Sequence, residues 1–295
     1  MRLFFSPLAV AALLGSLSSA TAEDFDWRKV DETLGRQPAT SGDVRRYAFP
    51  RSDLSVTLDG VAIKPALALG GWIAFKPTRG KAMVTGDFVL LESEVRPVTA
   101  KLIEGGLEIT AVHNHLLRAA PTPIYVHVGG TGDPAKLAAT IHDALAASKT
   151  PLTAPTSPGA TPPVDLDTAR LDEIVGVKGR AVGGVYQFIA PRRNQIIEDG
   201  TLLDPPGPLG VATVINFQPT GAGKAAITGD YVLTGEEVGA VTQALRSNGI
   251  EITAVHSHML TEQPRLLFIH FWANEDALKL AKGVRAALDK VDARN

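Results

Sequence analysis

The chain repeats itself, and this duplication constrains its fold more than any other feature. Residues 85–127 match residues 228–270 without a gap, at a constant offset of 143 positions. The two segments are identical at 21 of 43 positions, far more than unrelated segments share. Both contain a Thr-Gly-Asp block, an Ile-Thr-Ala-Val-His-x-His block and a third histidine. A repeat of this kind indicates two copies of one structural unit.

The repeated unit spans nearly the whole chain, because the match continues upstream with small gaps. Between the copies, residues 149–164 are rich in proline, threonine and serine, a composition that is typical of an extended linker. We therefore predict one repeat domain over residues 23–148 and a second over residues 165–295. We expect a pseudo-twofold axis to relate them, as in a fused homodimer.

Each copy is expected to combine a sheet with helices. In the first copy, hydrophobic periodicity and turn signals predict helices over 26–34, 93–104 and 134–147, a hairpin over 54–64, and strands over 71–75, 83–90, 107–116 and 124–128. The resulting β-α-β-β-α tail resembles the split βαβ unit of ferredoxin-like folds. The fold class is α+β, with two tandem domains that each carry a mostly antiparallel sheet and helices on one side.

The first 22 residues have the features of a secretory signal peptide. Arg2 supplies a positive start, residues 3–14 are mostly apolar, and residues 20–22 read Ala-Thr-Ala before Glu23. We expect cleavage before Glu23 and a periplasmic or secreted protein. The chain has no cysteine, which excludes a lipid-anchored form of this signal, disulfide bonds and thiolate ligands.

Six of the seven histidines form two equivalent sets related by the offset of 143. They are His113, His115 and His127 in the first copy, and His256, His258 and His270 in the second. The two histidines of each His-x-His pair lie two residues apart on a strand, so their side chains point to the same face. The third histidine lies on the next strand, so a hairpin without a bulge brings all three imidazoles together.

Three converging neutral imidazoles suit a divalent transition metal such as Zn²⁺, Cu²⁺, Fe²⁺ or Mn²⁺. Three protein ligands leave a position for water or substrate, which is the arrangement of catalytic sites. The alternative is that the histidines are core residues bonded to backbone carbonyls. Strict alternation supports this alternative, since it places Leu107 and Ile109 on the face that carries His113.

Two pairs of acidic residues recur beside the histidine blocks. Asp87 and Asp230 close the Thr-Gly-Asp blocks. Each acts either as a fourth metal ligand or as a carboxylate that orients an imidazole, or else belongs to a turn or bulge in the chain. Glu94 and Glu237 near the next helix start are candidate general bases, with helix capping as the alternative.

Further polar residues near the histidine blocks do not suit the same site. Glu108 and Glu251 alternate to the face opposite the histidines. Arg51 and Arg192 follow proline in both copies and suit salt bridges or anion binding.

The blocks TGDFVLLESEV and LEITAVHNHLL, with their counterparts TGDYVLTGEEV and IEITAVHSHML, carry a resemblance. The chain resembles the LppY/LpqO family of duplicated, exported bacterial proteins, which is classed as a domain of unknown function. The resemblance covers most of the chain after the first 22 residues. It implies duplication and export, and it supplies no activity.

These observations favour an exported protein with two equivalent three-histidine metal sites, either metal-binding alone or a metal-dependent enzyme on a small molecule or envelope component. The alternatives are a metal-free small-molecule binding module and a structural envelope protein with core histidines. The net charge is −2, and acidic and basic residues are interspersed along the chain. This charge pattern does not indicate binding to nucleic acid or to anionic lipid. Neither the substrate nor the oligomeric state follows from the sequence.

Overall fold

A computed structural model describes residues 25–153 and 162–293. The expected signal peptide and much of the expected linker therefore lie outside the described residues. The first half contains α1 (Trp27–Leu34), β1 (Ala39–Ser41), β2 (Val44–Pro50), β3 (Thr57–Leu58), β4 (Val61–Ala62), α2 (Pro65–Ala68), β5 (Gly70–Thr78), β6 (Lys81–Leu91), α3 (Glu92–Glu104), β7 (Glu108–His113), β8 (Pro123–Gly132) and α4 (Pro134–Leu145). The second half contains α5 (Thr168–Val175), β9 (Arg180–Val182), β10 (Val185–Pro191), β11 (Ile197–Glu198), β12 (Thr201–Leu202), β13 (Ala212–Gly221), β14 (Lys224–Leu233), α6 (Val238–Ser247), β15 (Glu251–His256), β16 (Leu267–Asp276) and α7 (Ala277–Leu288).

Both halves build the same six-stranded sheet, which confirms the duplicated α+β fold. The strand orders are β1-β2-β5-β6-β8-β7 and β9-β10-β13-β14-β16-β15, and all neighbouring strands are antiparallel. In the first half, β6 and β7 both pair with β8, and α3 connects β6 to β7. This is the expected split βαβ tail.

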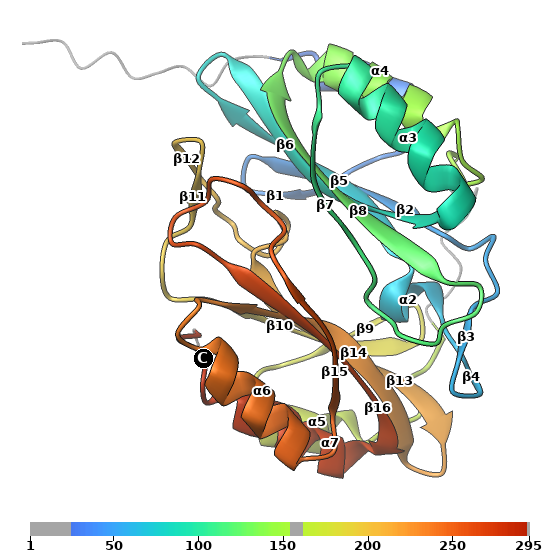
Figure 1. Ribbon diagram of the computed structural model, residues 1–295, viewed down its shortest axis with the longest axis vertical. Coiled ribbons are helices and arrows are strands. Elements are labelled where there is room, and N and C mark those ends of the chain that lie inside the picture. Colours follow the sequence, from blue (N-terminus) through green and yellow to red (C-terminus); the bar gives the residue numbers. More distant parts are fainter. Residues whose placement is uncertain (1–24, 154–161, 294–295) are drawn as a thin grey trace, which may run out of the picture.

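The longer helices of each half cover the outer face of its sheet, whereas the short helix α2 lies between the halves and contacts β13 and β14. Figure 1 shows α3 and α4 at one end of the molecule, α6 and α7 at the other, and the two sheets facing each other between them. Each half has its own core between helices and sheet, with Val98 and Phe88 in the first and Leu245 and Tyr231 in the second. None of the helices in the described residues is long and apolar enough to cross a membrane.

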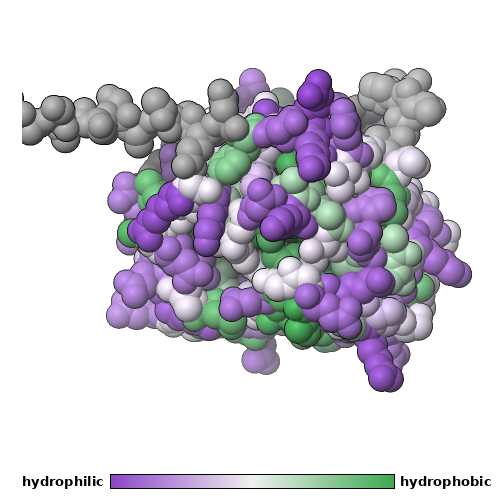
Figure 2. Space-filling model, turned by 90° about the horizontal axis from the view of Figure 1, so that it is seen from above, coloured by the Kyte–Doolittle hydropathy of each residue, from purple (hydrophilic) through white to green (hydrophobic). Residues whose placement is uncertain are grey.

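The outer surface over α3 and α4 is mixed in character. In Figure 2, which looks down on this end, hydrophilic side chains are spread over the face among smaller hydrophobic groups. This is the normal surface of a solvent-facing helical layer. The inner faces of the two sheets are therefore the surfaces that need explanation.

A β-bulge decides which side chains reach the space between the sheets. The pairing of β7 with β8 shifts register between Ile109 and Ala111, and β15 shifts at the equivalent place. One extra residue reverses the alternation. Leu107 and Ile109 consequently pack into the helical core, whereas His113 beyond the bulge faces the other half.

The bulge also corrects the expected position of the strand glutamates. Glu251 pairs with Trp272 in register, on the face that meets the other half. There its carboxylate accepts hydrogen bonds from Arg118 of the first half at 2.7 and 3.0 Å. Glu251 therefore lies on the histidine face of its sheet and not on the opposite face.

The Thr-Gly-Asp blocks lie inside long strands and not in turns. Asp87 pairs with Trp72 on one side and His127 on the other, and Asp230 pairs with Val214 and His270. The turn interpretation of these blocks is wrong. The glycine is required for a different reason, which is the close approach of the neighbouring backbone.

Gly229→Ala is expected to destabilise the protein by about 2–3 kcal/mol, as forced overpacking does. A Cβ at this position would lie 1.9 Å from the carbonyl oxygen of Val214, which is backbone and cannot move alone. Gly239→Ala in α6 is the matched control, because no atom lies within 4 Å of its added Cβ. Urea unfolding of both variants measures the effect, and equal stabilities would contradict this account.

Candidate metal centre

The six repeated histidines occupy equivalent places in the two halves. His113 and His256 are the last residues of β7 and β15, and His115 and His258 follow in the next turn. The third members, His127 and His270, lie in the middle of β8 and β16, opposite Ala111 and Ala254. All six project from the inner faces of the sheets.

The two sets meet each other, so the expectation of two separate sites is corrected to one shared cluster. The ring centroids of His113 and His256 are 3.6 Å apart. His115 lies 3.7 Å from His270, and His127 lies 3.7 Å from His258. Each contact is matched by its repeat counterpart, as a twofold interface requires.

Distances within each set suit a shared metal ion. The centroid of His113 lies 5.0 Å from those of His115 and His127, and the centroid of His256 lies 4.9 Å from that of His258 and 4.8 Å from that of His270. Imidazoles bound at about 2.0–2.1 Å to one ion have centroids roughly 4.5–5 Å apart.

Candidate ligand atoms also lie close together across the cluster. In two groups these atoms lie within 4.8 Å of one another: His113, His115 and His127, and His113 with His256, His258 and His270. His113 belongs to both groups, so the cluster is built from residues of both halves.

Backbone carbonyls hold three of the rings in one tautomer. Nδ1 of His113, His256 and His270 lies 3.4, 3.1 and 3.0 Å from the carbonyl oxygens of Asn114, Ser257 and Gly229, respectively. A carbonyl can only accept, so Nδ1 carries the proton and Nε2 presents a lone pair. Metal-binding histidines are commonly oriented in this way, with the ring N–H that points away from the metal donating to a carbonyl or carboxylate oxygen.

Every Nε2 in the cluster is buried and has no hydrogen-bond partner within the described residues. Leaving one buried polar atom unpaired costs about 1–3 kcal/mol, and here six gather in one place. A core histidine bonded through both nitrogens does not leave such an atom. The observation therefore favours the metal-site interpretation over the core interpretation.

Burial favours the neutral form of five of the imidazoles, and metal binding requires that form. Desolvation first, and neighbouring histidines second, lower the pKa of His256 to about 4 and that of His113 to about 2. The same causes place the pKa of His115, His127 and His258 well below the usual histidine value.

Flat side chains pack against one histidine of each set. The ring of His115 stacks on Tyr125 and that of His258 stacks on Phe268, both with 3.5 Å between centroids. Tyr125 is itself fixed, because its hydroxyl donates to the carbonyl of Ala68 at 2.7 Å. Sequence analysis did not identify these aromatic residues, although the match of Tyr125 to Phe268 in the repeat was a usable signal.

The two repeated aspartates border the cluster. Asp230 Oδ1 lies 2.8 Å from Nδ1 of His270, and Asp87 Oδ1 lies 3.8 Å from Nε2 of His127. Asp230 also forms a potential ligand group with His115 and His270. Burial, and then the charge of Asp230, raise the pKa of Asp87 well above its usual value. The structure thus places both aspartates where they can complete or orient a metal site.

The two candidate general bases lie elsewhere, each in an ion pair with a buried arginine. Glu94 accepts from Arg51 at 2.7 Å and from the backbone amides of Leu91 and Lys149 at 2.8 Å each. Burial alone would raise the pKa of Glu94, but these hydrogen bonds outweigh it and the pKa is lowered. The structure supports helix capping for Glu94 and brings it to no histidine.

Glu237 repeats this arrangement in the second half. It accepts from Arg192 at 2.6 Å, from the Thr234 amide at 2.7 Å and from the Asp292 amide at 2.9 Å. The two copies thus share an ion pair, between Glu94 and Arg51 and between Glu237 and Arg192, that the sequence did not predict. Each pair ties the end of its repeat to the start of α3 or α6.

A cavity of about 620 Å³ connects the cluster to the surface. Both halves line it, with His115 and His127 from the first and His258 from the second, and both aspartates reach its wall. Its volume falls in the range of about 300–1,000 Å³ that small-molecule sites occupy.

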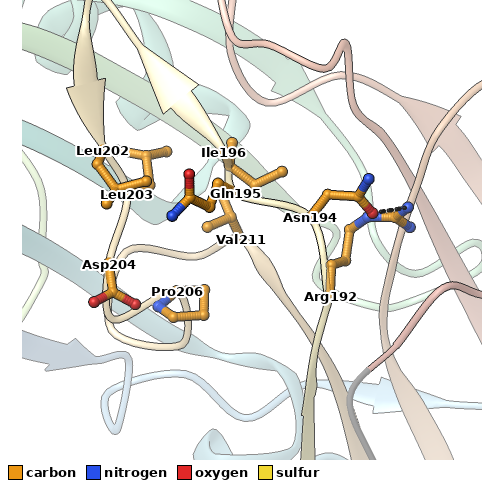
Figure 3. A pocket seen from close by; sticks show the side chains of 9 residues that line it. All are labelled: Arg192, Asn194, Gln195, Ile196, Leu202, Leu203, Asp204, Pro206 and Val211. Atoms are coloured by element: carbon orange, nitrogen blue, oxygen red, sulfur yellow. Dashed lines mark hydrogen bonds between the residues drawn. The ribbon is translucent and has the colours of Figure 1, made fainter.

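A smaller pocket of about 220 Å³ lies away from the histidines in the second half. Figure 3 shows Arg192 beside Asn194 at one end of it, and Leu202, Leu203 and Asp204 at the other. Arg192 is already engaged by Glu237. Of these two pockets, the larger cavity is the one that adjoins the histidine cluster.

The metal-free protein is expected to lose stability as the pH falls below about 6.5, where histidines of the unfolded chain take up protons. In the folded protein His113 and His256 resist protonation, because burial lowers the pKa of each. Each histidine that stays neutral in the folded protein then lowers the free energy of unfolding by about 1.4 kcal/mol for each pH unit below about 6.5. Urea unfolding between pH 7.5 and 5 measures the loss, and a flat profile would contradict it. The His113→Asn/His256→Asn variant is expected to show a smaller loss.

Comparison with known proteins supports the duplication. A family model described as a domain of unknown function (DUF1259) matches residues 28–147 and again residues 169–290. No curated protein matches the chain. The crystal structure of a trimeric bacterial microcompartment shell protein, PduB, is 15% identical over 87% of this chain and 91% of that one, with a TM-score of 0.22.

A second solved structure, EtuB from Clostridium kluyveri, is 9% identical over 85% of this chain and 88% of that one, with a TM-score of 0.20. TM-scores this low do not establish a shared fold. The family match, in contrast, covers most of the chain and coincides with both structural halves. The chain therefore belongs to the DUF1259 family of unknown function and contains two copies of its domain.

Proposed function

We propose that this chain binds divalent transition metal ions at the six-histidine cluster between its halves. The observation that carries the proposal is the set of six buried, unpaired Nε2 atoms that converge from both repeats. Imidazole nitrogens suit zinc, copper and iron, and the carboxylates of Asp87 and Asp230 add harder ligands that also suit manganese.

The centre is suited to act on a small molecule rather than to support the fold alone. Three histidines per set leave coordination positions for water or a ligand, and the adjoining cavity gives access to them. A metal held in this way supplies Lewis acidity or an activated water. The protein supplies neutral imidazoles, fixed tautomers and a partly dry wall.

Export and the finer family assignment belong to the same proposal. The apolar start and the Ala-Thr-Ala sequence before Glu23 support a cleaved signal peptide and a periplasmic or secreted location. The AVHxH blocks support membership of the LppY/LpqO group. Mass spectrometry of the exported protein tests the cleavage, with Glu23 expected at the new N-terminus.

Calorimetric titration of the metal-free protein at pH 7.5 tests the proposed metal binding. We expect saturable binding of zinc, with a stoichiometry of about one or two ions per chain. Because burial lowers the pKa of His113 and His256, binding should persist below pH 6.5, where protons already compete with the metal for exposed histidines. No saturable binding of zinc, copper, iron or manganese would refute the proposal.

A further inference from the structure

The wall of the cavity departs from the twofold symmetry that the histidines obey. Trp72 pairs with Asp87, and the corresponding partner of Asp230 is Val214. Arg46 pairs with Ala74 in β5, and its counterpart beside Asn216 is Gln187. The duplicated metal-binding residues are thus retained, whereas the cavity wall differs between the halves.

Two arginines of the wall, Arg46 and Arg180, form no salt bridge within the described residues, although burial lowers the pKa of Arg46 to about 9 and the charge of nearby Asp87 partly offsets this. Arg46 lies over the Trp72 ring, with 3.6 Å between its guanidinium carbon and the ring centroid, and its Nη1 donates to the carbonyl of Pro208 at 2.5 Å. Arg180 donates from Nε and Nη2 to the side-chain oxygen of Gln187.

The rest of the wall is mixed: Leu67, Ile189 and Val214 form apolar parts of it, and Asp87, Asp230 and the amide side chains of Gln187 and Asn216 form polar parts. Guanidinium groups recognise carboxylates and phosphates through paired hydrogen bonds. A guanidinium that is stacked on an aromatic ring and fixed by a carbonyl is already oriented for such recognition.

We infer that the cavity binds a small organic acid, whose acidic group pairs with Arg46 and Arg180 and whose apolar body lies against Trp72 and the aliphatic wall. This inference rests on the proposed metal centre in one respect only. It places the end of the ligand that is remote from the arginines near the histidines. The second half of the repeat could not bind the same acid in the mirrored orientation, because Gln187 and Val214 replace Arg46 and Trp72.

Calorimetric titration with benzoate, phenyl phosphate and benzyl alcohol tests the inference on metal-free and zinc-loaded protein. At least one of the two acids is expected to bind, and the neutral alcohol at least tenfold more weakly. Arg46→Gln, which copies the residue of the second half, should weaken acid binding about tenfold or more, because a charge-assisted hydrogen-bond pair is lost. Arg180→Ala provides a second variant should Arg46→Gln fail to fold.

Arg118→Gln is the matched control, since Arg118 bridges the halves outside the cavity through Asp59 and Glu251. It should bind the acid as the unchanged protein does. The inference is overturned if neither acid binds, if the alcohol binds equally well, or if both cavity variants bind like the unchanged protein. Normal zinc binding in those experiments would leave the metal centre standing, whereas acid binding without zinc binding would remove only the metal centre.

Discussion

Replacing His113 and His256 together with alanine is expected to lower the affinity for zinc by roughly a hundredfold or more. These residues face each other at the contact between the halves, 3.6 Å apart, and each belongs to the ligand set of its own repeat. Losing a partner that only orients a ligand already costs about 10–100-fold, so losing a ligand from both sets should cost more.

The matched control for this prediction is His142→Ala. His142 lies on α4, has no counterpart in the repeat and is partly exposed beside Asp143. Competition with a chelator of known affinity measures the zinc affinity of the unchanged protein, the double variant and the His142→Ala control. Undiminished zinc affinity in the double variant would show that the metal binds elsewhere, and an equal loss in the control would show a non-specific effect.

The second large effect concerns stability and separates a structural from a catalytic role. Glu94→Gln is expected to lower the free energy of unfolding by about 2–4 kcal/mol. The variant removes the carboxylate charge that pairs with the fully buried guanidinium of Arg51. Asp53 still pairs with this arginine at 2.8 Å, which keeps the loss below that of an isolated buried charge. Zinc affinity should not change.

Glu92→Gln is the control for this variant, because Glu92 begins the same helix and is exposed. Its effect should stay within about 0.5 kcal/mol, as for most surface substitutions. Urea unfolding and zinc titration of both variants provide the comparison. A stable Glu94→Gln protein that no longer binds zinc would return Glu94 to the metal centre and contradict its structural assignment.

Local signals in the sequence predicted most elements correctly. Asp59 and Gly60 both have positive φ in the hairpin between β3 and β4, as their dipeptide indicates. Asp133 caps α4 by accepting from the amide of Lys136, and Pro134 follows at the first helical position, which are the sequence signals of a helix start. By contrast, β2 was missed, since Arg45 and Arg46 interrupt the apolar pattern that identifies a strand.

The histidine cluster could be predicted only in part. Strand alternation and the repeat placed each set of three together, and the structure agrees. The union of both sets depends on how the halves dock, which no periodicity within one repeat encodes. The bulge before Ala111 was equally hidden, and it decides which side of the sheet each residue faces. The cavity arginines lacked any signal because they are not repeated.

The central claim is that six histidines from two repeats form one metal centre, and metal analysis of the purified protein tests it most directly. The protein would be purified without affinity tags or chelators, and its transition metals quantified by mass spectrometry beside the His113→Ala/His256→Ala variant. We predict about one or two transition metal ions per chain in the unchanged protein and a loss of most of this metal in the variant. A metal-free native protein, or equal metal in both, would contradict the account.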